Sequence, residues 1–182
     1  WCVYHHKNTD APETDNLQMS TDAATVDVTR WNDTAPTSSV FSLSDDTSVN
    51  GDGGEFSAYL WTGKQGFSKF GSYWGNDNAN GTFVYTGFRP AWIMIKNMTI
   101  ADSWFIYDTK RTVANIGTRN TLKANVVDVE QTGTGELLDI VSNGFKLRGS
   151  TGGTNDSGEN YVYAAFAEAP LVNSEGVPCN AR

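Results

Sequence analysis

The stretch "NDSGENYVYAAFAEAP", residues 155–170, decides how this chain folds. Its first residues, rich in Asn, Asp, Ser and Gly, are typical of a tight turn. The residues that follow, 160–168, are apolar on both faces of an extended strand, with Tyr161 and Tyr163 on one face and Val162 on the other. Because both faces of such a strand must be covered, we expect it to be an inner strand of a sheet.

The composition of the whole chain also favours strands over helices. Aromatic residues make up 12% of the 182 residues, 18 residues are glycine, and short apolar stretches alternate with clusters of Gly, Asn, Asp and Pro. We expect strands near residues 2–6, 24–29, 39–43, 55–61, 67–73, 82–86, 91–97, 103–108, 136–141, 144–148 and 160–168. A hairpin is expected from 90–97 and 101–108. We therefore predict an all-β protein with an antiparallel β-sandwich fold.

The turn and strand of the opening stretch recur 105 residues earlier in the chain, in "NGDGGEFSAYLWTG" (50–63). Two further pairs of segments match at nearly the same spacing. "WCVYHHK" begins at Trp1 and "WFIYDTK" begins at Trp104, 103 residues later; "SSVFSL" (38–43) parallels "SNGFKL" (142–147), 104 residues later. This regular spacing predicts two related copies or halves of one unit.

The repeat suggests a division of the chain into three segments. Residues 1–61 are expected to be the second half of a first copy, 62–170 a fuller second copy, and 171–182 a C-terminal tail. These segments can also pack as one sandwich domain. A solenoid is not expected, because solenoid units have periods of about 20 to 50 residues.

The charge of the chain argues against nucleic-acid and membrane partners. Its formal net charge is -8 with only 13 Lys and Arg residues, so no basic surface is available to neutralise many phosphates. An anionic membrane surface is disfavoured for the same reason. No apolar run approaches the roughly 18 to 20 residues that span a bilayer. We expect no nucleic-acid partner and no membrane insertion.

Candidate catalytic residues are scarce. His5 and His6 are the only histidines, and neighbours on a strand face opposite sides, so at most one could serve a given site. No Gly-x-Ser-x-Gly nucleophile motif accompanies them. The acidic residues lie mostly in turn-like contexts, where Asp satisfies backbone donors. We expect no catalytic residues and no enzyme activity; the alternative, a polysaccharide-acting enzyme, needs a cleft with converging carboxylates.

The stretch "SYWGNDNANG" (72–81) is the best candidate for a binding site, because sugar recognition commonly combines an aromatic platform with planar hydrogen-bonding groups. Its candidate ligand-binding residues are Tyr73, Trp74, Asn76, Asp77, Asn78 and Asn80. The alternative is that Tyr73 or Trp74 fills the core and the Asn residues only shape a long turn.

Clustered oxygen ligands give a weaker indication of calcium binding. Asp52, Asp77 and Asp156 lie in three polar stretches whose oxygen atoms a hard cation can take, but none of these stretches has the spacing of an EF-hand. Two of the stretches occupy matching repeat positions before a strand, so a tight turn is the preferred interpretation. We expect no cofactor and no metal site, with calcium as the alternative.

Several longer stretches resemble a known family. They are similar to the C-terminal repeat domain of phage tail-fibre and related virion structural proteins, which is common in marine phages and often accompanies LamG-like jelly-roll modules. The similar stretches are "GFSKFGSYWGN" (66–76), "FVYTGFRPAWIMIKN" (83–97), "WFIYDTKR" (104–111), "SNGFKLRGSTGGTNDSGENYVYAAFAEAP" (142–170) and "VNSEGVPCNAR" (172–182). The first half of the chain looks like the preceding copy. "YLWTGKQG" (59–66) departs from the family, where similar chains read closer to "YLFAE".

The resemblance implies a virion surface protein with a jelly-roll, LamG-like β-sandwich, displayed on a tail fibre or spike after assembly in the host cytoplasm. It further implies attachment to a host cell-surface glycan or receptor, contacts with other virion proteins and a homo-oligomeric state. No catalytic residues transfer from this family. The alternative is a purely structural capsid or fibre building block without a ligand site of its own.

Overall fold

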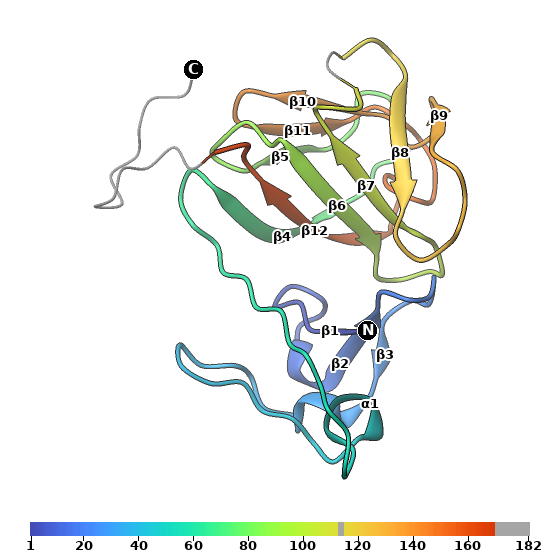
Figure 1. The fold of residues 1–182 in the computed structure, drawn as a ribbon. Helices are drawn as coiled ribbons and strands as arrows, with labels where there is room; N and C mark the ends of the chain where they lie inside the picture. Colours follow the sequence, from blue (N-terminus) through green and yellow to red (C-terminus); the bar gives the residue numbers. More distant parts are fainter. Residues whose placement is uncertain (113–114, 170–182) are drawn as a thin grey trace.

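The computed structural model describes residues 1–112 and 115–169, which form two parts (Figure 1). The larger part, the two-sheet body, runs from β4 to β12 and contains one six-stranded and one three-stranded sheet. The smaller N-terminal part, residues 1–61, holds another three-stranded sheet. All strand pairings among the described residues are antiparallel, so the expectation of a mainly β chain with antiparallel sheets is confirmed. The expected tail, 171–182, lies outside the described residues.

The two sheets of the body face each other. The six-stranded sheet consists, in spatial order, of β4 (Ser68–Trp74), β12 (Asn160–Phe166), β6 (Trp92–Asn97), β7 (Trp104–Asp108), β8 (Arg119–Lys123) and β9 (Gln131–Gly133). The sheet opposite consists of β10 (Leu138–Val141), β11 (Gly144–Leu147) and β5 (Phe83–Tyr85). The expected hairpin from 90–97 and 101–108 is confirmed as β6 and β7.

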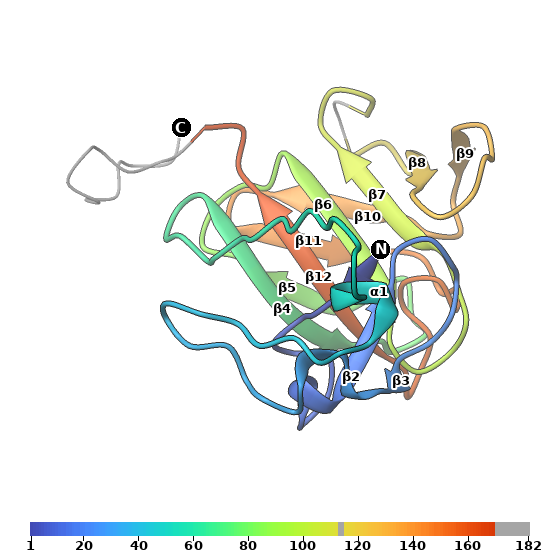
Figure 2. The same ribbon diagram turned by 60° about the horizontal axis from the view of Figure 1, so that its bottom comes forward.

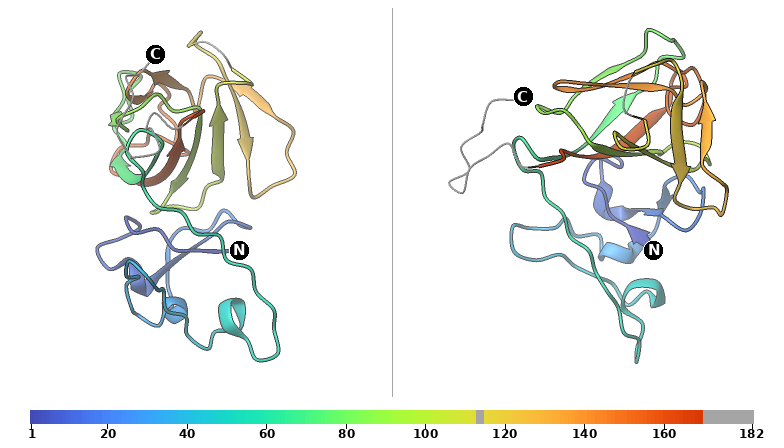
Figure 3. Two further views of the ribbon diagram at one scale, coloured as in Figure 1. Left: turned by 60° about the vertical axis from the view of Figure 1, so that its left-hand side comes forward. Right: turned by 45° about the horizontal axis from the view of Figure 1, so that its top comes forward.

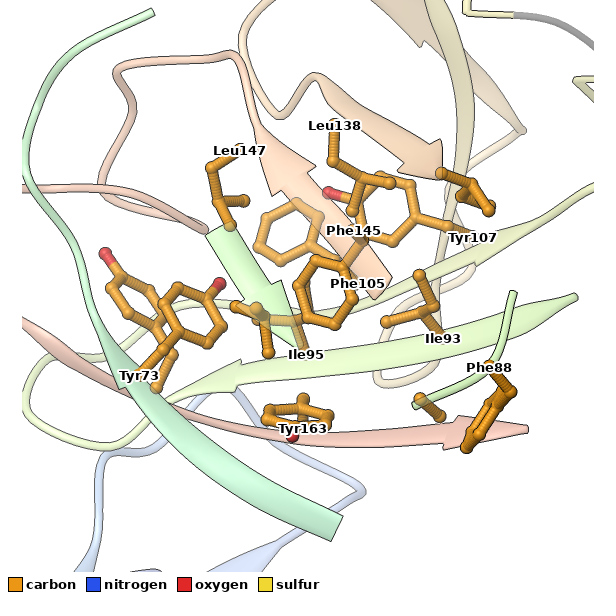
Figure 4. Close-up of a cluster of buried hydrophobic side chains, with 14 residues drawn as sticks. Tyr73, Phe88, Ile93, Ile95, Phe105, Tyr107, Leu138, Phe145, Leu147 and Tyr163 are labelled. Atoms are coloured by element: carbon orange, nitrogen blue, oxygen red, sulfur yellow. The ribbon is translucent and has the colours of Figure 1, made fainter. Parts of the chain in front are cut away.

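The main core fills the space between these sheets (Figure 4). Ile93 and Ile95 of β6 point inward on alternate positions and meet Phe145 and Leu147 of the smaller sheet. Each fully buried side chain of this size contributes about 1.5 to 3 kcal/mol of hydrophobic stabilisation. At the rim of the core, the Tyr107 hydroxyl donates to the Glu136 carbonyl at 2.9 Å, and burial raises the pKa of Tyr107 well above its usual range. Tyr107 therefore adds apolar area without leaving its buried donor unpaired.

The strand β12 is an inner strand, as its two-sided apolar pattern predicts. It lies between β4 and β6, with Tyr163 opposite Gly71 on one side and Ile95 on the other. A Cβ atom at Gly71 would lie 2.8 Å from the Tyr163 hydroxyl oxygen, so glycine at this position makes room for the tyrosine ring. Tyr161 and Tyr163 face the main core, whereas Val162 faces the N-terminal part.

The N-terminal part has little regular structure. Its sheet consists of β1 (Cys2–Val3), β2 (Asp15–Gln18) and β3 (Val26–Asp27) in that order, accompanied by two 3-10 turns at Pro12–Thr14 and Thr29–Trp31. The short helix α1 (Thr47–Asn50) is capped by Asp46, whose carboxylate accepts the Ser48 N–H at 2.7 Å. No helix among the described residues has the length and apolar character that a membrane crossing needs.

This part lies on one side of the body (Figures 1 and 2) and packs against the outer face of the six-stranded sheet. Leu17 of β2 is fully buried in a second apolar cluster with Trp104 and Val162. The indole N–H of Trp104 donates to the Gln18 carbonyl at 3.1 Å, and the Thr25 N–H donates to the Met98 carbonyl at 2.9 Å. Apolar contact and hydrogen bonds together hold the two parts side by side.

Two expected strands are absent. Residues 39–43 and 55–61 form no strand, and 55–61 runs as an extended, exposed segment between α1 and β4 (Figure 3). The prediction was wrong here because a strand needs partners as well as an apolar pattern, and this segment has none among the described residues.

Three short strands, β2, β8 and β9, were not predicted from the sequence. Their sequences are polar, which hides the strand pattern; β8 reads "RNTLK". Arg119 at its start is buried, with Nε donating to the Leu138 carbonyl and Nη2 donating to the Asn115 side-chain oxygen, both at 2.7 Å. A polar strand is stable in this place because its buried donors find acceptors.

Candidate binding site

The loop that joins β4 to β5, residues 75–81, is anchored by one buried side chain. Asn155 is fully buried, and its amide nitrogen donates to the Asn76 side-chain oxygen at 3.1 Å and to the Asn78 carbonyl at 3.0 Å. Its side-chain oxygen accepts the Asn76 N–H at 3.2 Å, and its carbonyl accepts the Asp77 N–H at 2.7 Å. The loop is therefore fixed to the turn before β12.

Amide side chains within the loop also cap its own backbone. The Asn76 side-chain oxygen accepts the Asn78 N–H at 3.2 Å, and that of Asn78 accepts the Asn80 N–H at 2.7 Å. Asp77 has a φ of 47°, a left-handed conformation that Asp tolerates. A Cβ at Gly75 would lie 2.1 Å from the Asp156 carbonyl oxygen. Only glycine therefore fits at the first position of the loop. The amides give the loop its shape, as the alternative interpretation expects.

The two aromatic residues before the loop have different environments. Tyr73 is buried, its ring stacks on Tyr161 with centroids 5.1 Å apart, and its hydroxyl donates to the Thr154 carbonyl at 2.7 Å. Trp74 is the next residue on β4, so it points to the opposite face, and 62% of its surface is exposed. Of the two, Trp74 is the residue that a ligand can reach.

A shallow groove, here called the edge groove, follows β4 and β5 away from the loop, between the edges of the two facing sheets. It has a volume of about 350 Å³ and is lined by Lys7, Lys69, Phe70, Gly71, Ser72, Tyr73, Phe83, Val84, Tyr85 and Tyr163. Phe83 and Tyr85 flank the inward-pointing Val84 and are 45% and 57% exposed. The Lys69 ammonium donates to the Tyr85 carbonyl at 2.7 Å and lies 5.2 Å from the ring centroid.

The edge groove is not predicted by the sequence. The alternation in "FVY" (83–85) indicates that Phe83 and Tyr85 share a face, but nothing in the sequence places Lys69 beside them. The groove offers aromatic rings and two ammonium groups, Lys7 and Lys69, on a chain whose net charge is -8. Its lining holds no carboxylate or histidine, so it presents binding groups rather than an acid and base pair.

The three calcium candidates do not form one cluster. The Asp77 N–H bonds to the Asn155 carbonyl, which brings Asp77 near Asp156, whereas Asp52 lies in the turn after α1 in the N-terminal part. Over residues 1–112 and 115–169, no group of three or more His, Cys, Asp or Glu side chains gathers as a metal site would require.

Two basic groups, one half-buried and one fully buried, lie where the N-terminal part meets the sheet. Burial lowers the pKa of His5 to about 4. The Lys7 N–H donates to Nδ1 of His5 at 3.1 Å, so Nε2 carries the proton that bonds to the Tyr163 carbonyl at 3.2 Å. Lys96 is fully buried, its ammonium donates to the Asn97 carbonyl at 2.6 Å, and burial lowers its pKa to about 8. The bond of His5 joins the N-terminal part to β12, whereas that of Lys96 stays within β6.

Comparison with known proteins identifies a family. No curated protein and no solved structure matches it. A family described as a domain of unknown function, DUF7483, matches residues 1–170, and the match takes in both the N-terminal part and the two-sheet body. The chain belongs to the DUF7483 family.

Proposed function

We propose that this chain is a β-sandwich domain of jelly-roll type on the surface of a phage virion, in a tail fibre or spike, and that it binds a glycan of the host cell surface. The binding surface consists of Trp74 at the start of the anchored loop and the neighbouring edge groove. The resemblance of the sequence to virion repeat domains supports the setting, and the two facing antiparallel sheets are compatible with the fold.

The observation that carries the binding proposal is the exposure of three aromatic rings on a rigid frame. Trp74, Phe83 and Tyr85 belong to strands that are paired within sheets, and the loop between these strands is anchored by Asn155. Rings held in this way lose little conformational entropy when a ligand stacks on them. Phe83 and Tyr85 point away from the core on the smaller sheet and Trp74 on the six-stranded sheet, so each side of this edge offers a ring on which the apolar face of a sugar can stack.

The groups beside the rings favour an acidic glycan. Lys7 and Lys69 both line the edge groove, and Lys146 lies opposite Phe83 in the neighbouring strand β11. Ammonium groups attract carboxylate-bearing sugars over short distances, whereas the remaining acidic surface repels them. We therefore expect a glycan with carboxylate groups to bind at this edge, with binding that weakens as salt increases.

Glycan binding by single-residue variants tests this proposal. Trp74→Ala and Tyr85→Ala are each expected to weaken binding to purified acidic host polysaccharide by about tenfold or more, because each removes a stacking ring. Ile116→Ala is the control, since Ile116 is exposed and lies in the segment before β8, far along the six-stranded sheet from β4. Unchanged binding in both aromatic variants would contradict the proposal, as would a parent chain that binds no glycan.

A second candidate function is a structural building block made of repeated units, and the strand registers favour it. In the N-terminal part, Val3 of β1 pairs with Leu17 of β2. In the body, Ile106 of β7 pairs with Leu122 of β8. The partners correspond at spacings of 103 and 105 residues, which are the spacings of the sequence repeat.

The next pair of strands has the same correspondence. Asn16 of β2 pairs with Val26 of β3, and Thr121 of β8 pairs with Gln131 of β9. Both partners are displaced by 105 residues. The strand order β1-β2-β3 therefore has a counterpart in β7-β8-β9.

Two backbone hydrogen bonds outside the strand pairings, one in each part, also correspond. The Met19 N–H donates to the Trp1 carbonyl at 2.9 Å, and the Ala124 N–H donates to the Trp104 carbonyl at 3.0 Å. These agreements support the proposal that residues 1–61 are the second half of one copy and 62–170 a fuller copy. A fibre built from such copies needs no ligand site, and glycan binding by the parent chain is the result that decides between the two functions.

A further inference from the structure

We propose that residues 55–61 are an inner strand whose two neighbours are missing, and that they bind a β4-type and a β6-type strand from the first half of another copy of the unit, joined ahead of Trp1. This inference rests on the repeat proposed above. The partner is thus a segment with the character of residues 66–97, which contain β4, β5 and β6 of the body.

The turn before the segment has the conformation of its counterpart. Gly53 has a φ of 70° and Gly158, 105 residues later, has a φ of 82°. Both glycines are in the left-handed region, where a side chain would be strained. The same local turn therefore precedes residues 55–61 and β12, although only β12 is paired.

The apolar residues of the segment lie in solvent. The exposed fractions of Phe56, Tyr59, Leu60 and Trp61 are between 49% and 72%, whereas the central residues of β12, 161–163, are buried. Burial of large apolar side chains is worth about 1.5 to 3 kcal/mol each, so neighbouring strands would find a strong driving force here. In an extended segment Phe56 and Leu60 lie on one face and Tyr59 and Trp61 on the other, which is the two-sided apolar pattern of an inner strand.

The body shows which strands are missing. There, β12 lies between β4 and β6, and β6 lies between β12 and β7. In the N-terminal part, β1 is the counterpart of β7 and ends the sheet β1-β2-β3, with no β6-type strand beside it. The ring of Trp1 instead contacts Tyr59 of the segment, with centroids 5.7 Å apart. The counterparts of β7 and β12 are therefore in contact through these side chains and are not joined by an intervening strand.

The connection between strands favours a partner joined ahead of Trp1. In the body, β6 ends at Asn97 and β7 begins at Trp104, so a short turn links them. Trp1 is the counterpart of Trp104, and a β6-type strand can therefore enter β1 through a turn of the same length. A second copy of the chain is a poorer donor, because its β4 and β6 already flank its own β12 and would have to exchange by domain swapping.

The test is an extended chain in which a copy of residues 64–103 is placed directly ahead of Trp1. Hydrogen exchange measured by mass spectrometry should show the amides of 55–61 protected by about 100-fold or more relative to the parent chain, as for amides of an inner strand. Tryptophan emission should shift to shorter wavelength as Trp1 and Trp61 become buried. The extended chain should remain a monomer.

The matched control carries Ile93→Asp and Ile95→Asp in the added copy only, which removes the core-facing residues of the β6-type strand without changing the parent sequence. It should leave 55–61 as open as in the parent. The inference is overturned if the intact extension gives no more protection than this control, or if protection appears only in a dimer. Glycan binding through Trp74 is measured on the parent chain alone, because the added copy carries its own Trp74, so a failure of the proposed binding function stays distinguishable from a failure here.

Discussion

Residues 50–61 and 155–166 carry the same order of polar turn and apolar strand, but their environments are opposite. The second segment forms the turn that anchors the loop 75–81 and then β12, which is paired on both sides. The first forms α1 and an exposed stretch with no strand partner among the described residues. The residue pattern thus makes a segment able to form a strand. Whether the strand forms depends on the neighbouring strands with which it can pair.

The largest expected effect comes from counterpart aromatic residues. Tyr161→Ala should lower the free energy of unfolding by about 3 to 5 kcal/mol, because Tyr161 is fully buried in the main core. Its counterpart Phe56 is half exposed, so Phe56→Ala should change stability by less than about 0.5 kcal/mol. Urea unfolding followed by circular dichroism measures both.

If Tyr161→Ala does not fold, Tyr161→Phe replaces it. This variant removes only the hydroxyl that donates to the Gly152 carbonyl at 2.8 Å, at an expected cost of about 1 to 2 kcal/mol. Equal effects at positions 56 and 161 would refute the contrast between the two segments.

The contact between the N-terminal part and β12 should depend on pH through His5. Its pKa is lowered from 6.5 to about 4 in the folded chain, so between these values the unfolded chain takes up a proton that the folded chain does not. Stability due to this group is therefore present above about pH 6.5 and is lost as the pH falls toward 4, by up to about 3 kcal/mol.

Unfolding by urea at several pH values, in the parent and in His5→Gln, measures this dependence. The variant should have a flatter profile between pH 6.5 and pH 5, where carboxylates contribute little. Parallel profiles for the two proteins would show that His5 is not buried in its neutral form.

The smallest of these effects concerns the counterpart asparagines that open the two turns. Asn155→Ala should cost about 2 kcal/mol, because it leaves partners in the loop 75–81 unpaired, and it should also weaken any binding at Trp74. Asn50 is exposed, and Asn50→Ala should change stability by less than about 0.5 kcal/mol. Thermal unfolding compares them, and a similar loss in both would contradict the anchoring role of Asn155.

The sequence predicts those parts of the fold that depend on local pattern. The two-sided apolar pattern of β12 and the hairpin of β6 and β7 are of this kind. The polar strands β2, β8 and β9 are not, because Arg119 is accommodated by acceptors from distant residues such as Leu138. Their stability depends on partners that a local pattern does not contain.

The candidate site likewise has parts that the sequence predicts and parts that it does not. Alternation along β4 requires Tyr73 and Trp74 to face opposite sides, but it does not say which one enters the core. The edge groove unites Lys69 with Phe83 and Tyr85 from another strand, so it exists only once the two sheets face each other. Asn155 anchors a loop 79 residues before it in the chain, which no short motif indicates.

The most direct test of the account is hydrogen exchange at residues 55–61 and 160–166, measured side by side in the parent chain and in the chain extended by a copy of 64–103. We predict that the parent exchanges rapidly at 55–61 and slowly at 160–166, and that the extension makes the two segments alike. Slow exchange at 55–61 in the parent, or rapid exchange at 55–61 in both proteins, would contradict the account.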